Sequence, residues 1–308
     1  MTFDEQFFRT EDIPVEGPGR ELIGYGAHPP HVRWENDARV AVQIVLNYEE
    51  GSEKTFAMGD GVNDILYELP FALEGQRDLA VESMYEYGTR AGVWRLLRVF
   101  DGAGIPITWF ASAVAVERNP EVGRAIARRG DDTAGHGFRW SNHFEMTRDE
   151  EREAIRRAVL SIERTTGSRP VGWYCREMSV NTRELVVEEG GFVYDSDYYG
   201  DDLPFWTNHN GTKHLVVPYS LVNNDGTFGN GFGPGKDFEE HLRYTFDRLY
   251  KEGETYPKMM NIGLHMRMIG HPGRAQALSN FIGYAKSFPG VWFARRIDIA
   301  SHWIEHHP

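Results

Sequence analysis

The chain has 308 residues, 41% of them apolar, which is enough for a full hydrophobic core in one large domain or in two ordinary ones. Its formal net charge of −13 at pH 7 would repel a phosphate backbone, and no Lys/Arg-rich run offsets that field locally. We therefore expect no nucleic-acid partner and, because no apolar stretch approaches the roughly 20 residues that cross a bilayer, no membrane partner.

The N-terminal region has the composition of an irregular segment. Residues 1–20 are acidic and lack the hydrophobic stretch of an export signal, and the single cysteine, Cys175, cannot form an internal disulfide. Both features predict a cytoplasmic protein. Residues 1–36 are rich in Pro, Gly and charged side chains and show little periodicity, so we predict an arm laid over one catalytic domain, residues 37–308.

Short apolar runs recur along the rest of the chain, as is typical of strands buried on both faces of a parallel sheet. These runs cover residues 40–46, 107–113, 171–175, 215–217, 259–264 and 291–294. Apolar residues at helical spacing mark residues 90–101, 148–166 and 237–252. A Thr147–Glu150 capping box precedes the second of these helices and Gly167 follows it. The alternation predicts an α/β fold with a parallel sheet, closed or open.

In such folds the polar residues at the carboxyl ends of the strands usually form the active site. This rule selects Glu49 and Glu50 after the first strand, His136 where a third strand runs into residues 135–140, Arg176 after residues 171–175, and His265 and Arg267 after residues 259–264.

Each selected residue type suits a catalytic role, although a solvated acid, a structural histidine or a structural ion pair remains the alternative. Adjacent carboxylates after a strand point in different directions, so Glu49 and Glu50 can act separately, one as a general base and the other as an orienting or metal-binding group. His136 lies between two glycines, where nothing local shields it. Arg176 can bind a carboxylate through two hydrogen bonds or keep Glu49 ionised.

The remaining selected pair and the surrounding sequence complete the candidate site. If the last long strand continued past His265, Arg267 would share its face, and together they would suit an oxyanion or a planar polar substrate. Aromatic residues such as Trp140 could line a pocket for a flat ligand. Residues 226–235 are the one dense glycine patch and are typical of a mobile loop or lid. A phosphate-binding loop and a Gly-x-Ser-x-Gly nucleophile motif are both absent from the sequence.

Several segments resemble the cofactor-independent bacterial allantoinases of the polysaccharide deacetylase superfamily, and the likeness covers nearly all of the chain after residue 20. The segments are residues 23–26, 46–51, 82–88, 90–97, 136–140, 195–197 and 263–265. The resemblance implies a deformed (β/α) barrel of about seven strands and a homotetramer. It also implies a hydrolase of purine catabolism that opens the hydantoin ring of allantoin, a small cyclic amide, to give allantoate.

The resemblance also raises the question of a metal. In the superfamily's deacetylases, the first of two acidic residues acts as the base, and the second binds a divalent metal with two histidines four residues apart. The metal-binding positions correspond here to Glu50, His136 and Trp140, so two potential ligands remain where a catalytic zinc ordinarily has three, and the spacing of His143 departs from the pattern. We expect no metal and no other cofactor, with a zinc-dependent site as the alternative.

Without a metal, attack on a cyclic amide needs a positioned base and a stabilised oxyanion. Our hypothesis is that Glu49 takes the proton and that His265 or His136 stabilises the oxyanion or protonates the leaving nitrogen. Arg176 or Arg267 would anchor the carbonyl or ureido groups, and Glu50 and Trp140 would complete the substrate-binding site. Because residues 176–179 and Met266 differ from what close allantoinases lead us to expect, another cyclic amide or imide remains open. The sequence is also compatible with an N-acetyl sugar deacetylase and with a non-catalytic barrel that binds a purine metabolite.

Overall fold

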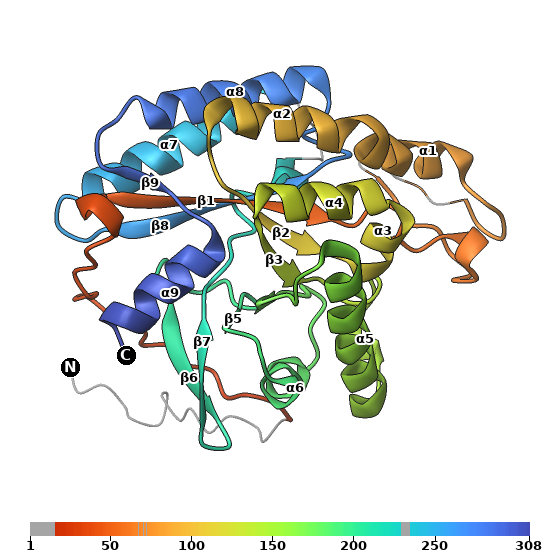
Figure 1. Cartoon of the computed structure of the whole chain (residues 1–308), viewed down its shortest axis with the longest axis horizontal. Helices are drawn as coiled ribbons and strands as arrows, with labels where there is room; N and C mark the ends of the chain where they lie inside the picture. The colour runs from red at the N-terminus through yellow and green to blue at the C-terminus, as the bar shows by residue number, and fades with distance from the viewer. Residues whose placement is uncertain (1–15, 67, 70, 72, 229–234) are drawn as a thin grey trace, which may run out of the picture.

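The computed structural model describes residues 16–66, 68–69, 71, 73–228 and 235–308. Within them, nine strands form one sheet whose main path runs β6-β7-β5-β4-β3-β2-β1-β8, while β9 pairs with the first residues of β1 (Figure 1). The strands are β1 (Val40–Tyr48), β2 (Thr108–Ala111), β3 (Asp132–Gly135), β4 (Gly172–Trp173), β5 (Tyr194–Asp195), β6 (Phe205–His209), β7 (Thr212–Val216), β8 (Lys258–His265) and β9 (Val291–Phe293).

Every strand pair in this sheet is parallel except the β6–β7 hairpin. The α/β fold of the deformed-barrel type predicted from the sequence is confirmed, with nine strands in place of about seven. The sequence did not reveal β5 and β6, which are short or only half buried and therefore lack a continuous apolar run.

The connections are mostly helical, as parallel pairing requires. The helices are α1 (Leu79–Tyr87), α2 (Val93–Ala103), α3 (Ala113–Arg118), α4 (Pro120–Arg129), α5 (Arg148–Thr166), α6 (Thr182–Glu189), α7 (Lys236–Glu252), α8 (Pro272–Lys286) and α9 (Arg296–His306). The prediction for residues 148–166 is confirmed at both ends, together with its capping box and the left-handed Gly167. The helix predicted at residues 90–101 is the end of a longer segment, in which α1 continues through a π-helical turn, η4 (Gly88–Gly92), into α2.

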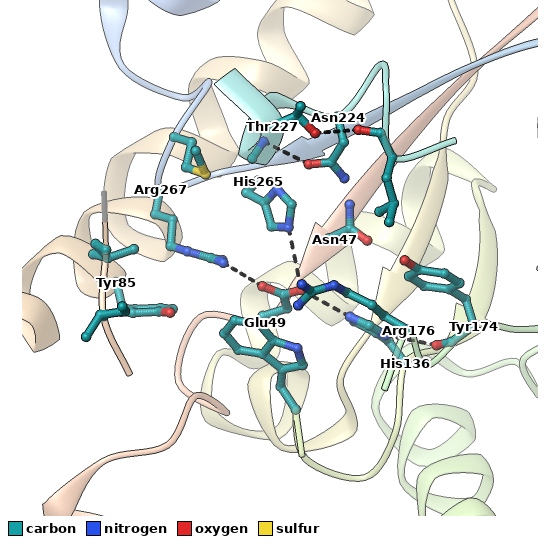
Figure 2. Close-up of a pocket in the computed structure, with 16 residues that line it drawn as sticks. Asn47, Glu49, Tyr85, His136, Tyr174, Arg176, Asn224, Thr227, His265 and Arg267 are labelled. Carbon is teal, nitrogen blue, oxygen red and sulfur yellow. Dashed lines mark hydrogen bonds and ion pairs between the residues drawn. The ribbon is translucent and has the colours of Figure 1, made fainter. Parts of the chain in front are cut away.

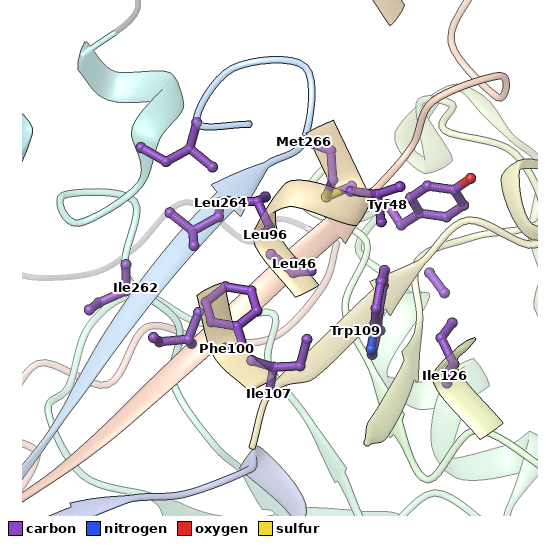
Figure 3. Close-up of a cluster of buried hydrophobic side chains, with 14 of the residues drawn as sticks. Leu46, Tyr48, Leu96, Phe100, Ile107, Trp109, Ile126, Ile262, Leu264 and Met266 are labelled. Carbon is purple, nitrogen blue, oxygen red and sulfur yellow. The ribbon is translucent and has the colours of Figure 1, made fainter. Parts of the chain in front are cut away.

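The largest apolar cluster holds β1 at the centre of the molecule. All nine residues of β1 are buried, and α2, α7 and α8 lie over β1 and β8. Figure 3 shows Leu46 of β1, Leu264 of β8 and Phe100 of α2 meeting in this layer. Burying one such side chain contributes about 1.5–3 kcal/mol, so the layer fixes the strand whose carboxyl end bears Glu49.

The described part of the predicted arm, residues 16–36, contains no strand and no α-helix. Its Val32 and Trp34 are buried in a second apolar cluster with Trp303 of α9, and the Trp34 ring donates a hydrogen bond to the Lys258 carbonyl. The division into an arm and one catalytic domain stays a prediction. Among the described helices, none has the length and apolar character required to span a membrane.

Candidate active site

Glu49 is the centre of the site. It follows the last residue of β1, and its side chain is only 3% exposed. The Oε1 atom lies 3.1 Å from His136 Nε2 and 3.6 Å from His265 Nε2, and Oε2 lies 2.7 Å from Arg267 Nη2 (Figure 2). Burial alone would raise the pKa of Glu49, but the charges of Arg267 and His265 and the hydrogen bonds from both histidines hold it well below the ordinary value. Glu49 is therefore a carboxylate at neutral pH.

His265 is held between two carboxylates. It is the last residue of β8, and its Nδ1 lies 2.6 Å from Asp225 Oδ1, while its backbone N–H donates to Asp225 Oδ2 at 2.8 Å. Burial lowers the pKa of His265, but the charges of Glu49 and Asp225 outweigh burial and raise it to about 9. The ring is therefore an imidazolium at neutral pH, with its Nε2 proton directed toward Glu49.

His136 contacts the other side of Glu49 and is 2% exposed. Its Nδ1 lies 2.8 Å from the Tyr174 carbonyl, which can only accept, so Nδ1 carries a proton and Nε2 faces Glu49. The rings of Tyr174 and Phe110 lie against it, with centroids 5.2 and 6.3 Å away. The prediction that nothing local shields His136 is wrong, because these two rings cover it.

Arg267 supplies the cation for Glu49. β8 ends at His265, so the condition under which Arg267 would share the face of His265 is not met; Arg267 lies in the turn that leads to α8. Its side chain is 5% exposed, and its guanidinium lies over the rings of Tyr85 and Trp140, at 4.6 and 5.3 Å from their centroids. Among the described residues, Nε and Nη1 of Arg267 have no hydrogen-bond partner.

Glu50 lies behind Glu49 and does not line the cleft that contains it. Its carboxylate accepts hydrogen bonds from the backbone N–H groups of Arg267 at 3.0 Å and Glu49 at 3.2 Å. Burial, opposed by the Arg267 charge and reinforced by Glu49, raises the pKa of Glu50 to about 7. Gly88 lets η4 pack here, since a β-carbon would lie 2.6 Å from Glu50 Oε1 and 2.8 Å from the Arg267 nitrogen. In this geometry Glu50 orients Arg267 rather than the substrate.

Arg176 reaches the same cleft from the end of the β4 segment. Its backbone is left-handed, with φ of +59°, and its N–H donates to Asp197. The side chain is 54% exposed, and its Nη1 lies 2.6 Å from Glu177 Oε1. The direct contact with Glu49 is made by Arg267, and the Arg176 guanidinium contacts Glu177. Arg176 lines the open part of the cleft, where a substrate group could meet it.

The cleft around these residues has a volume of about 390 Å³. Ile65, Leu66, Leu221 and Met268 give it apolar walls, and Trp140 lines it as predicted. Sequence reasoning missed Asp225, which lies in the 3₁₀ helix η6 (Asp225–Phe228), and also the cleft residues Asn47 and Tyr85. Of the predicted loop 226–235, residues 229–234 lie outside the described residues.

The residues at the superfamily's metal positions do not fit a zinc site. Glu50 already accepts two backbone hydrogen bonds, His136 directs Nε2 at Glu49, and the indole of Trp140 offers no ligand. His143 is engaged by Glu151 at 3.0 Å. Within the described ranges no group of three or more His, Cys, Asp and Glu side chains is arranged to bind a metal. The metal-free site remains a prediction for experiment.

Comparison with known proteins shows which sequences and folds this chain resembles. Residues 75–189 match the family model for polysaccharide deacetylases. A Schizosaccharomyces pombe protein provisionally named as a polysaccharide deacetylase is 37% identical over 94% of this chain and 98% of its own length. A crystal structure described as that of a probable polysaccharide deacetylase from Pseudomonas aeruginosa PAO1 is 49% identical over 94% of this chain and 99% of that chain, with a TM-score of 0.90.

A crystal structure of PuuE allantoinase is also similar: it is 48% identical over 96% of this chain and 99% of that chain, with a TM-score of 0.91. The fold is thus that of an amidohydrolase-type enzyme acting on carbon–nitrogen bonds. On these matches, the chain belongs to the polysaccharide deacetylase family.

Proposed function

We propose that this protein hydrolyses a cyclic amide and that its substrate is allantoin, whose hydantoin ring it opens to give allantoate. The observation that carries the proposal is the charge arrangement around Glu49, a buried carboxylate between an imidazolium and a guanidinium in a small cleft. This arrangement places a base and an acid on either side of a reacting group. The similarity to PuuE allantoinase supports the choice of ring.

The reaction proceeds in two stages. Glu49 takes a proton from a water molecule, whose oxygen attacks the ring carbonyl carbon and forms the new C–O bond. His265 then gives its Nε2 proton to the ring nitrogen as the C–N bond breaks. The proton that Glu49 took from water then passes to His265, whose Nε2 lies 3.6 Å from Oε1. The new carboxylic acid releases its own proton to solvent. Both groups return to their starting state.

The two arginines have separate roles in this scheme. Arg267 is a permanent cation beside Glu49, so it keeps the base ionised, and its charge stabilises the developing oxyanion. Arg176, half exposed at the mouth, anchors a carbonyl or ureido group of the substrate. His136 lies against the Glu49 carboxylate, with Nε2 3.1 Å from Oε1, and so limits where the carboxylate can move.

The proposal extends to the location, pathway, assembly and metal content that the resemblance to allantoinases implies. The protein would act in the cytoplasm in purine catabolism, as a homotetramer, without a metal. Sedimentation analysis of the purified protein tests the tetramer, and metal analysis before and after dialysis against a chelator tests the absence of zinc. Stoichiometric zinc whose removal abolishes turnover would overturn the metal-free mechanism.

The deciding experiment measures allantoate formation from allantoin by chelator-treated protein, with succinimide, hydantoin and an N-acetylated chitin oligomer in parallel. Formation of allantoate supports the proposal. Turnover of another ring but not of allantoin would retain ring opening and reject the named substrate. Release of acetate from the oligomer alone would favour the sugar deacetylase that the names of the other relatives suggest.

A further inference from the structure

The side-chain amide of Asn47 is held in one orientation beside the catalytic pair. Asn47 is paired with His265 across β1 and β8, and it lies two residues before Glu49, so its side chain projects from the same face of the sheet. Its Nδ2 donates to the Leu264 carbonyl at 3.3 Å and to the Tyr219 hydroxyl at 3.1 Å. Because a carbonyl oxygen can only accept, the amide cannot be flipped.

The Asn47 oxygen is consequently directed into the cleft. Asn47 lines the cleft and is 2% exposed, and Oδ1 accepts no hydrogen bond from any of the described residues. Figure 2 shows the oxygen on the side of Tyr174 and Arg176, away from the strand that carries His265. An acceptor so fixed, and open to the cleft, can take a hydrogen bond from a ligand N–H that reaches it.

The partner that holds Asn47 is itself rigid. Tyr219 is buried, and its hydroxyl oxygen also accepts a hydrogen bond from Asn224 Nδ2 at 3.1 Å. It lies over Gly263, where any β-carbon would overlap the hydroxyl. Asn47 therefore belongs to a packed network in which a shift of its oxygen away from the cleft has no room.

We propose that Asn47 Oδ1 selects substrates that carry an unsubstituted ring N–H next to the scissile carbonyl group. This inference rests on the proposed ring-opening function and narrows its substrate class to cyclic ureides and imides with a free N–H. Arg267 and His265 line the same cleft, so it presents cationic N–H groups as well as the Asn47 acceptor, which together suit a –CO–NH– edge. A methyl group on that nitrogen leaves Oδ1 unpaired and collides with it.

The test compares hydantoin with two hydantoins methylated at one ring nitrogen or the other. The wild-type protein is expected to have kcat/KM at least about 100-fold lower for one of the methylated rings than for the parent. Asn47→Leu keeps the size of the side chain and removes the acceptor. This variant should have a lower kcat/KM for the parent ring and a nearly unchanged kcat/KM for the methylated ring. The preference for the parent over the methylated ring should therefore fall below about tenfold.

Two further variants separate recognition from stability. Tyr219→Phe removes one group that holds the Asn47 amide, and the preference should fall to an intermediate value. Asn223→Leu removes a buried amide that bonds to the Asn261 carbonyl and His241, outside the cleft, and should leave the preference unchanged even if the thermal midpoint drops. Because the readout is a ratio, a partly unfolded preparation does not alter it.

The outcomes distinguish the inference from the function on which it rests. Equal turnover of all three rings by the wild-type protein, or an unchanged preference in Asn47→Leu, overturns the role of Asn47 and leaves ring hydrolysis standing. If the wild-type protein opens no cyclic amide at all, the proposed function fails, and the inference fails with it. A preference that collapses in Asn47→Leu and persists in Asn223→Leu supports it.

Discussion

Replacing Asp225 by Asn should shift the alkaline limit of activity toward neutral pH. His265 must be protonated to deliver a proton to the leaving nitrogen, and the charges of Glu49 and Asp225 raise its pKa from 6.5 to about 9 against the opposing effect of burial. That difference corresponds to roughly 3 kcal/mol at about 1.4 kcal/mol per pH unit. Asp225 contacts His265 at 2.6 Å, and Glu49 contacts it at 3.6 Å, so Asp225 carries a substantial share.

The size of the effect follows from that share. If removing the Asp225 charge lowers the His265 pKa by about 1.5 units, the protonated fraction at pH 8.5 falls from about three quarters to about one tenth, and kcat/KM falls roughly eightfold. At pH 6 the ring is mostly protonated in both proteins, so kcat/KM should differ by less than about threefold. The variant is thus expected to lose activity chiefly above pH 7.

The effect on stability should follow the same ionisation. A histidine whose pKa is raised by folding stabilises the native state fully below its unfolded value of 6.5, and this stabilisation is lost as pH rises through about 9. Asp225→Asn should therefore lower the free energy of unfolding by about 1–2 kcal/mol at pH 6 and by less at pH 10.

The assay is a pH profile of kcat/KM with allantoin, or with whichever ring the protein hydrolyses, together with urea unfolding at both pH values. Asp237→Asn removes the same charge from an exposed position at the start of α7 and should leave the alkaline limit unchanged. An Asp225→Asn protein whose alkaline limit matches the wild type would refute the reasoning, because His265 would then not be the acid, or Asp225 would not set its protonation.

Three other substitutions test the site. Glu49→Gln should lower kcat by about a thousandfold or more with an unchanged circular dichroism spectrum, and near-normal turnover would refute its role as the base. Arg267→Gln removes the charge that opposes burial, so the Glu49 pKa should rise and the acidic limit of kcat/KM should move to higher pH; an unmoved limit would mean that other groups keep Glu49 ionised. Gly88→Ala forces η4 away from Glu50 and Arg267, and chemical unfolding should show a loss of about 1–3 kcal/mol, whereas wild-type stability would mean that this contact can relax.

The long elements of the fold were predictable because their signals are local. The α5 helix has its capping box, its apolar stripe and its terminal glycine within one segment, and β1 is a continuous buried run. The β5 strand has two residues and is recognisable only by its neighbours β4 and β7. The helical segment before residue 90 was missed because Gly88 and Gly92 weaken a helical pattern, although both pack tightly against the segment that follows β8.

The candidate site divides in the same way. Glu49 and His265 were found because they follow strands of a parallel sheet, where the fold gathers polar groups. Asp225 follows no strand directly and lies beside a glycine-rich stretch, and only the packing of η6 against β8 brings it to His265. The sequence could not divide the roles of the two arginines, because distance from a strand end does not say which guanidinium reaches Glu49. The sequence did contain a signal for Asn47. It lies two residues before Glu49, and residues two apart in a strand project from the same face of the sheet.

The position of Arg267 suggests why this site can work with a base held far below its ordinary pKa. A carboxylate so stabilised is a weak base in isolation, and proton transfer from water to it is correspondingly uphill. Negative charge moves from Glu49 to the new oxyanion as the water attacks. Arg267 and His265 then stabilise the oxyanion with little reorganisation, because both cations lie beside the reacting position before the reaction begins. The charge that lowers the basicity of Glu49 thus stabilises the transition state, and for this reason Arg267→Gln is expected to reduce kcat even at a pH where Glu49 remains ionised.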